Sequence, residues 1–309
     1  MDNQRPLRFQ KVSLVGVGLL GGSLGRALRV RKLADHVAGW VRREASVTES
    51  VARGAVDSAT RDPAAAVRDA DLVVLCTPIG QMRALTERFL PFLSPGALVT
   101  DVGSAKAALV AELEAPVAAA GGVFVGSHPM AGSEQTGVAH ADPALFEDAV
   151  CVVTPTERVP EMAVRRVEDL WRAVGARTVR LSPAQHDELV SRSSHLPHLL
   201  AAALVRTVLR EELPPEQGRL CATGFRDTTR VASGSVAMWR DIVQQNRACL
   251  ERVLAEFADG LEELRAAVRA DDPAAIERFL ADAKTRRDRW LAEHPSPPAS
   301  GGEPNAPSS

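Results

Sequence analysis

The chain has 309 residues, of which 45% are hydrophobic and 25% are charged, and its formal net charge is −2. This composition is typical of a globular protein with one large and one smaller domain, and it excludes a fibrous or wholly disordered chain. The nearly balanced charge provides no positive field for nucleic-acid binding. We therefore expect a small molecule or a second copy of the chain as the partner.

The cysteines and the hydropathy of the chain indicate a cytoplasmic protein. Four scattered cysteines, Cys76, Cys151, Cys221 and Cys249, have neither C-x-x-C spacing nor the density of a disulfide scaffold, so we expect free thiols. No stretch approaches eighteen apolar residues, and residues 1–10 are polar. Neither a membrane span nor a signal peptide is expected.

Residues 8–182 alternate β-rich apolar runs with helical patterns, which is typical of βαβ units on a parallel sheet. The predicted strands are 11–16, 37–41, 72–77, 98–102, 123–126, 149–154 and 178–181. The predicted helices include 23–31, 47–52, 82–92 and 105–119. We therefore expect an α/β Rossmann-type dinucleotide-binding domain.

Residues 183–292 have no strand signal and read as long amphipathic helices. This segment has few aromatic residues and looks too thin to bury its own apolar faces, so we expect an all-α domain that forms a homodimer. Residues 295–309 contain five prolines with Gly, Ser and Asn, a composition that predicts a disordered tail.

A glycine motif follows the first predicted strand. The G-x-G-x-x-G pattern places Gly16 at the turn, Gly18 where a pyrophosphate approaches, and Gly21 against the strand. We expect the diphosphate at the N-terminus of the helix predicted from Ser23, with motif residues Leu19 and Leu20 also at the cofactor. A purely structural turn is the alternative.

The end of the second strand predicts the preferred cofactor. NAD-binding domains usually have an Asp or Glu there, whereas this chain has Val41, Arg42 and Arg43, with no acid until Glu44. Two guanidinium groups suit a 2′-phosphate, so we expect NADP to be preferred, NAD being possible, with Arg42 as the chief contact and Ser46 as a helper. Alternatively, both arginines are solvated surface residues.

Three segments lie at predicted strand ends, where ligands bind in such sheets. Thr77 and Pro78 turn the chain towards the cofactor, and Ser104 lies on a small loop after the next strand. His128 lies on a segment with Pro and Gly that we expect to be irregular, and its imidazole, with a pKa near ~6.5, suits a general base. The alternatives are a structural histidine and a serine that only caps a helix.

The helical half adds two further candidates. His195 and His198 are three residues apart and should share a helical face, but no third ligand at a recognisable spacing indicates a metal site. Residues 224–230 place Arg226 and Arg230 on either side of Asp227 in what we expect to be a polar turn. Arginine binds carboxylates through two donors, so an anionic substrate is expected here; a salt-bridge cluster is the alternative.

Taken together, GVGLLGGSLGRAL, CTP, TDVGSAK, SHPMAGSEQTG, SHLPH and GFRDTTR, in this order over roughly residues 10–290, resemble the prephenate/arogenate dehydrogenase family. The resemblance implies that His128 accepts the proton of the ring hydroxyl and that Ser104 holds the imidazole beside the nicotinamide. It also implies substrate-binding roles, which fall on Arg230, His198 or His195, Glu134 and Asp227.

The implied reaction is the oxidative decarboxylation of prephenate to 4-hydroxyphenylpyruvate in tyrosine biosynthesis. Arogenate and 4-amino-4-deoxyprephenate remain alternative substrates. Other readings are a β-hydroxyacid dehydrogenase, which would leave SHPMAG and SHLPH unexplained, and a nicotinamide-binding sensor without catalysis. We expect a monofunctional enzyme, without the regulatory or chorismate mutase domains that extend some relatives.

Overall fold

The computed structural model describes residues 7–132, 135–214 and 216–294. Contacts within the chain define two compact units, one ending at Val253 and the other beginning at Leu254. Glu134 and the expected tail, residues 295–309, lie outside the described residues. The first unit contains all the other candidate site residues.

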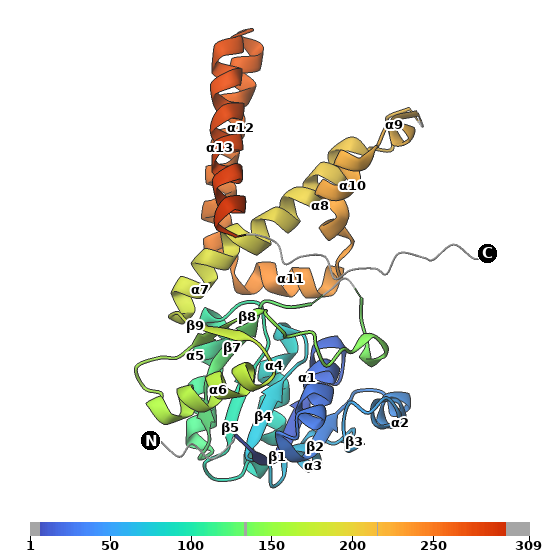
Figure 1. Cartoon of the computed structure of the whole chain (residues 1–309), viewed down its shortest axis with the longest axis vertical. Coiled ribbons are helices and arrows are strands. Elements are labelled where there is room, and N and C mark those ends of the chain that lie inside the picture. Colours follow the sequence, from blue (N-terminus) through green and yellow to red (C-terminus); the bar gives the residue numbers. More distant parts are fainter. Residues whose placement is uncertain (1–6, 133–134, 215, 295–309) are drawn as a thin grey trace, which may run out of the picture. The chain divides into compact units, whose positions relative to one another are not determined.

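A six-stranded parallel sheet forms the centre of the first unit, in the order β3-β2-β1-β4-β5-β6 (Figure 1). This order confirms the predicted Rossmann-type sheet. The short strand β3 was not predicted. The strands are β1 (Phe9–Val15), β2 (Ala34–Trp40), β3 (Ser58–Thr60), β4 (Leu72–Leu75), β5 (Leu98–Asp101) and β6 (Val123–Phe124).

Both faces of this sheet are buried, which explains its continuous apolar strands. Along β4, Leu72 and Val74 belong to one hydrophobic cluster, whereas Val73 and Leu75 belong to a second. Successive side chains of a strand point to opposite faces, so each cluster fills one side of the sheet. Trp171, which is fully buried, is the largest side chain of the first cluster.

Helices connect the strands. The helices expected from residues 23, 47 and 82 begin earlier, at Leu19, Glu44 and Ile79. For the first and the third, the prediction missed an apolar start that contains glycine or follows a proline. α1 starts at Leu19 rather than Ser23, since Gly21 and Gly22 lower the helical signal of its first turn. The helices of this half are α1 (Leu19–Val30), α2 (Glu44–Ala52), α3 (Pro63–Val67), α4 (Ile79–Phe89), α5 (Ala107–Ala119) and α6 (Glu161–Ala173).

A second, three-stranded sheet corrects two expectations. It consists of β7 (Gly126–Pro129), β8 (Val150–Thr154) and β9 (Arg177–Arg180), with β7 antiparallel to β8 and β8 parallel to β9. The last two predicted strands therefore lie outside the six-stranded sheet. His128 is part of β7 and pairs with Val152, so the expectation of an irregular segment was wrong. Pairing with β8 overrides the local effect of Gly and Pro.

The helical part begins at Ser182, whose side chain and that of Gln185 form a capping box at the start of α7. No strand follows β9 in the described residues, as expected. The expected turn at residues 224–230 was wrong, because most of it forms α10. The elements are α7 (Pro183–Val190), the π-helical turn η3 (Ser191–His195), α8 (Leu196–Val208), α9 (Glu216–Arg219), α10 (Thr223–Thr229), η4 (Arg230–Ser233), α11 (Val236–Gln245), α12 (Arg247–Arg269) and α13 (Pro273–Glu293).

Within the first unit, α11 packs against α4 and α5 and so joins the helical part to the sheet domain (Figure 1). Gly80 on α4 allows this approach, because a Cβ there would lie 2.6 Å from the Asp241 carboxylate of α11. All four cysteines are free, as predicted. In the described part of the chain, no helix is both long and apolar enough to cross a membrane.

Candidate active site

The glycine loop fits a dinucleotide. Gly16 has φ of 109°, a conformation that favours glycine, and a Cβ on Gly21 would lie 2.0 Å from the Gly16 carbonyl oxygen. A Cβ on Gly18 would instead meet no atom within 4 Å. Gly18 thus borders open space at the start of α1, where Leu19 and Leu20 begin the first turn and no side chain caps its N–H groups. Such a terminus is suited to a phosphate.

Thr77 and Pro78 border the same loop. A Cβ on Gly16 would lie 2.9 Å from the Thr77 side chain, so the ends of β1 and β4 meet closely. Thr77 Oγ1 is buried and has no hydrogen-bond partner among the described residues. A buried hydroxyl without a partner is costly and fits a ligand that would supply one. Pro78 is the N-cap residue of α4.

The end of β2 carries two exposed cations. Trp40 and Val41 are buried, whereas Arg42 and Arg43 are exposed. Glu44, the first acid after the strand, forms an ion pair with Arg61 at 3.3 Å. A carboxylate for an adenosine ribose is therefore missing from the end of this strand, and the two guanidinium groups occupy that edge instead.

His128 is held inside the protein by another histidine. Its side chain is buried in β7, and its Nδ1 lies 2.9 Å from His186 Nε2 on α7. His186 Nδ1 in turn lies 2.8 Å from Asp187 Oδ1. The three side chains thus form a hydrogen-bonded series that begins in the sheet domain and ends in the helical part.

Asp187 is fixed by the beginning of α5. Its Oδ1 accepts a hydrogen bond from the Lys106 backbone N–H at 2.7 Å, and its Oδ2 accepts one from Ala107 at 2.9 Å. The positive end of a helix dipole favours a carboxylate at this position. The Asn246 side chain donates to the Asp187 carbonyl oxygen at 2.8 Å and holds the same residue from the other side.

A buried ion pair lies beside this series. Lys106 and Asp101 form a salt bridge, and neither side chain is exposed. Asp101 also accepts hydrogen bonds from the backbone N–H groups of Gly103 and Ser127, while Lys106 Nζ donates to the Ser127 carbonyl oxygen at 3.0 Å. These bonds offset the desolvation of both charges and anchor the strand that carries His128.

The histidines of this region favour the neutral state. Burial holds the pKa of His128 well below its ordinary value, and the nearby His186, Lys106 and His195 lower it further. Burial also lowers the pKa of His186, although the Asp187 carboxylate acts in the opposite direction. A neutral imidazole has a free lone pair and is therefore a proton acceptor at neutral pH.

The structure brings His195 and His198 together around Trp239 of α11. The His198 ring stacks on the indole with 3.5 Å between centroids, and the His195 ring meets it edge-on at 6.0 Å. Both histidines are buried, and among the described residues His195 Nε2 and His198 Nδ1 have no hydrogen-bond partner. Polar atoms in this condition mark a place for a polar ligand.

The remaining predicted residues lie on exposed or partly exposed segments. Arg230 begins η4, which packs against α8, the helix of His198. Asp227 is exposed on α10. Ser104 is partly exposed after β5; within the described residues, the His128 ring is hydrogen-bonded to His186 rather than to Ser104. Glu134 lies outside the described residues.

Sequence reasoning did not single out His186, Asp187, Trp239 or Asn246. A signal for the first two existed. Positions 186, 187 and 190 form the inward face of α7, and His186 and Asp187 occupy positions that an apolar pattern would fill. Two titratable residues on a buried helical face are a mark of a functional or structural network.

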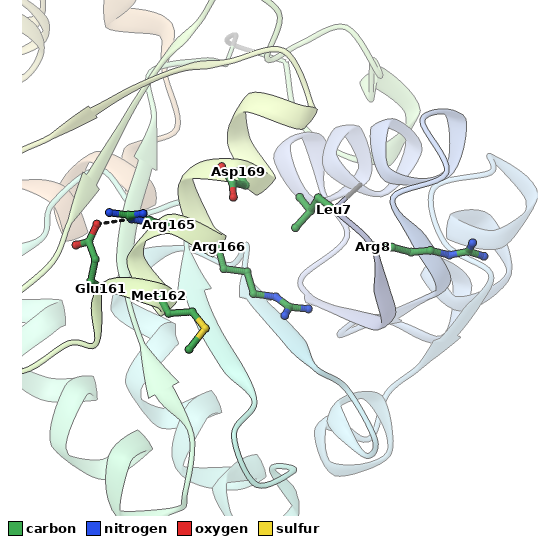
Figure 2. Close-up of a pocket in the computed structure, with 7 residues that line it drawn as sticks. All are labelled: Leu7, Arg8, Glu161, Met162, Arg165, Arg166 and Asp169. Carbon is green, nitrogen blue, oxygen red and sulfur yellow. Dashed lines mark hydrogen bonds and ion pairs between the residues drawn. The ribbon is translucent and has the colours of Figure 1, made fainter. Parts of the chain in front are cut away.

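An open surface pocket lies elsewhere. It is formed by the start of the described chain and one face of α6, and the Arg165–Glu161 ion pair at 2.8 Å lies on its rim (Figure 2). None of the predicted site residues lines it. The lining residues are Leu7, Arg8, Glu161, Met162, Arg165, Arg166 and Asp169.

Comparisons with known proteins agree over both halves of the chain. Residues 24–180 match the family model of the prephenate dehydrogenase nucleotide-binding domain, and residues 182–282 match that of the prephenate dehydrogenase dimerization domain. Prephenate dehydrogenase of Bacillus subtilis is 34% identical over 90% of this chain and 75% of its own length. Cyclohexadienyl dehydrogenase of Zymomonas mobilis is 32% identical over 90% of this chain and 95% of its own length.

A solved structure is similar over the same extent. The crystal structure of prephenate dehydrogenase from A. aeolicus, in complex with hydroxyphenyl propionate and NAD+, matches with a TM-score of 0.86 and 31% sequence identity. The match covers 93% of this chain and all of that chain.

The buried neutral histidines predict that acid destabilises the fold. Burial lowers the pKa of His195 from 6.5 to about 4, although the charge of Asp187 opposes this. Its contribution to stability is therefore complete above pH 6.5 and is lost as the pH falls towards 4, on the order of 3 kcal/mol in total. In urea unfolding at pH 7 and pH 5, His195→Gln should show a smaller loss of stability than wild type.

His140→Gln is the matched control, because His140 is exposed. This variant should retain the full pH dependence. Equal pH dependence in wild type and His195→Gln would contradict the prediction.

Proposed function

Because the chain belongs to the prephenate dehydrogenase family, we propose that it converts prephenate to 4-hydroxyphenylpyruvate and carbon dioxide with a nicotinamide nucleotide, in tyrosine biosynthesis. The observation that carries this proposal is the buried His128, hydrogen-bonded at Nδ1, on a strand that packs against β5 of the nucleotide-binding sheet; burial holds the pKa of this histidine well below its ordinary value. An alcohol oxidation needs such a group, because the hydroxyl proton must leave with the hydride.

The chemistry assigns one task to His128. Its imidazole would accept the proton of the ring hydroxyl as the carbon that bears this hydroxyl loses hydride, and a nicotinamide nucleotide held at the glycine loop of Gly16 and Gly18 would supply the hydride acceptor. The bond to the ring carboxylate then breaks, carbon dioxide leaves, and the bonding electrons enter the ring, which becomes aromatic. The phenolate oxygen recovers a proton from His128, so the histidine ends the cycle neutral. Ser104, partly exposed at the neighbouring strand end, would border the nicotinamide.

Arg230 is our candidate for a substrate carboxylate. It is exposed at the start of η4, beside the helix that carries His198. A guanidinium offers two parallel donors to a carboxylate. The unpartnered nitrogens of His195 and His198 would contact the side-chain end of the substrate. We assign supporting substrate-binding roles to Asp227 and Glu134.

The nicotinamide nucleotide is held at the glycine loop, and we propose a preference for NADP over NAD. The support is the pair of exposed cations, Arg42 and Arg43, at the end of β2, together with the absence of an acid before Glu44. A carboxylate at that position would repel a 2′-phosphate, whereas a guanidinium would bind it.

We also propose a homodimer formed through the helical half. Apolar side chains on these helices and on the segments between them remain between 40% and 84% exposed in the single chain, and a dimer interface would cover them. The match of residues 182–282 to a dimerization domain supports the same assembly. The four free cysteines fit a reducing compartment, and we place the protein in the cytoplasm. Examples of the exposed residues are Leu209, Leu213, Leu220, Val236, Leu261, Val268 and Leu280.

The first functional prediction concerns His128. Wild type should reduce the nucleotide in the presence of prephenate, and His128→Asn should lose about 10²–10⁴-fold in kcat, the usual contribution of a general base. Nucleotide affinity should not change, because the glycine loop is untouched. Steady-state kinetics and a nucleotide titration measure both effects. A loss of less than about tenfold would show that His128 is structural.

The second concerns Arg230. Arg230→Ala should raise KM for prephenate by about one to three orders of magnitude, because a charge-assisted pair with the carboxylate is lost. Arg226→Ala, four residues earlier on the same segment, is the control and should leave KM nearly unchanged. The reverse result would place the carboxylate at Arg226.

The third concerns the nucleotide and the substrate together. Measured with prephenate and with arogenate, kcat/KM should be higher with NADP than with NAD and higher with prephenate than with arogenate. Arg42→Ala should lower the affinity for NADP while leaving that for NAD unchanged, since only NADP carries the 2′-phosphate. Equal or better use of NAD by wild type, or an Arg42→Ala variant with unchanged NADP affinity, would overturn the assignment.

A further inference from the structure

We propose that His186 and Asp187 are positioning residues that fix the tautomer of His128, so that the lone pair of His128 lies on Nε2, the nitrogen that removes the substrate proton. This proposal rests on the proposed role of His128 as the base. Two residues of α7 would thus position a base that lies on β7 in the sheet domain.

The hydrogen-bond directions around Asp187 are fixed. The backbone N–H groups of Lys106 and Ala107 can only donate, and each points at a different oxygen of this carboxylate. Both oxygens therefore accept, which is the behaviour of an ionised carboxylate. His186 Nδ1, 2.8 Å from Oδ1, must then be the donor. The proton of His186 is thus on Nδ1.

The position of the proton on His186 fixes which atom donates in its hydrogen bond to His128. A neutral His186 with its proton on Nδ1 has its lone pair on Nε2, which lies 2.9 Å from His128 Nδ1. His128 must therefore donate from Nδ1, and its own lone pair is on Nε2. In the other tautomer, two lone pairs would face each other across a buried contact, which is costly. The geometry therefore selects one of the two neutral forms of the base.

The charges around the two rings favour the same state. Burial lowers the pKa of His128, and the nearby His186, Lys106 and His195 lower it further, which favours a neutral resting base. Burial lowers the pKa of His186, whereas the hydrogen bond from its ring to Asp187 and the charges of Asp187 and Asp101 raise it. When His128 takes up the substrate proton, its Nδ1–H keeps the bond to His186, and the Asp187 carboxylate at the far end stabilises the new positive charge.

The arrangement also makes the base depend on the docking of α7. His186 and Asp187 are on the inward face of this helix, and α7 is held to the start of α5 by the two backbone bonds to Asp187. His128 is 58 residues away in the sequence. The reactive tautomer is therefore selected only when the helical part is correctly seated on the sheet domain.

Two variants at position 186 distinguish a positioning role from a purely structural one, because one keeps a hydrogen-bond acceptor and the other does not. His186→Gln keeps a neutral acceptor that reaches His128 Nδ1, whereas His186→Leu fills similar space without an acceptor. We expect His186→Leu to lose about 10- to 100-fold in kcat, with KM and nucleotide affinity nearly unchanged, and His186→Gln to recover most of that loss. Equal activity of the two variants would overturn the proposal.

A spectroscopic measurement tests the tautomer without any turnover. In wild type labelled with ¹⁵N-histidine, His128, assigned by its loss in His128→Asn, should give the signature of a proton on Nδ1 and a lone pair on Nε2. His186→Leu should show the other tautomer or a mixture. A proton on Nε2 in wild type would overturn the proposal, even if a variant failed to fold.

The two measurements also distinguish this inference from the proposed function. Lack of prephenate turnover by wild type would refute the proposed function, while the NMR signature would still report the tautomer that the geometry requires. Normal prephenate turnover with the wrong tautomer would refute only the role of His186 and Asp187.

Discussion

The carboxylate of Asp187 is the contact on which the site depends. It accepts two N–H groups at the start of α5 and one from His186, and thereby joins the helical part to the sheet domain. A buried carboxylate is stable only when its oxygens are satisfied, so the position of α7 is set by hydrogen bonds of fixed direction rather than by apolar packing, which has no direction. The orientation of His128 follows from that position.

Burying the polar groups around His128 costs desolvation free energy, which hydrogen bonds from neighbouring residues offset. Two charged side chains, Lys106 and Asp101, are fully buried beside two neutral histidines. Their mutual attraction and the bonds to Gly103 and Ser127 offset the desolvation of both side chains. Removing either partner would leave a buried charge without compensation, which typically costs about 3–5 kcal/mol. The strand that carries the base is therefore anchored by the same polar groups that tune its surroundings.

The sequence predicted what local patterns determine and missed what distant contacts determine. The parallel strands and the glycine loop have local signals, and the structure contains them. The strand of His128 was missed because its pairing with Val152 outweighs the Gly and Pro beside it. The start of α1 was missed because glycines weaken the helical pattern. The His186 contact links residues 58 positions apart, and no local pattern reports such a pairing.

The proposed substrate and nucleotide carry several negative groups, namely a diphosphate, a ribose phosphate and a carboxylate, whereas the protein is nearly neutral overall. The site separates the tasks: the start of α1 suits the diphosphate, the arginines after β2 suit a ribose phosphate, and Arg230 suits a substrate carboxylate. Burial lowers the pKa of His128, His186 and His195 and favours their neutral state. In the proposed reaction, fixed cations would bind charge at the edges of the site, while the proposed base His128 would keep a lone pair. A histidine that also had to bind an anion would be driven towards its protonated form, in which it cannot accept the hydroxyl proton.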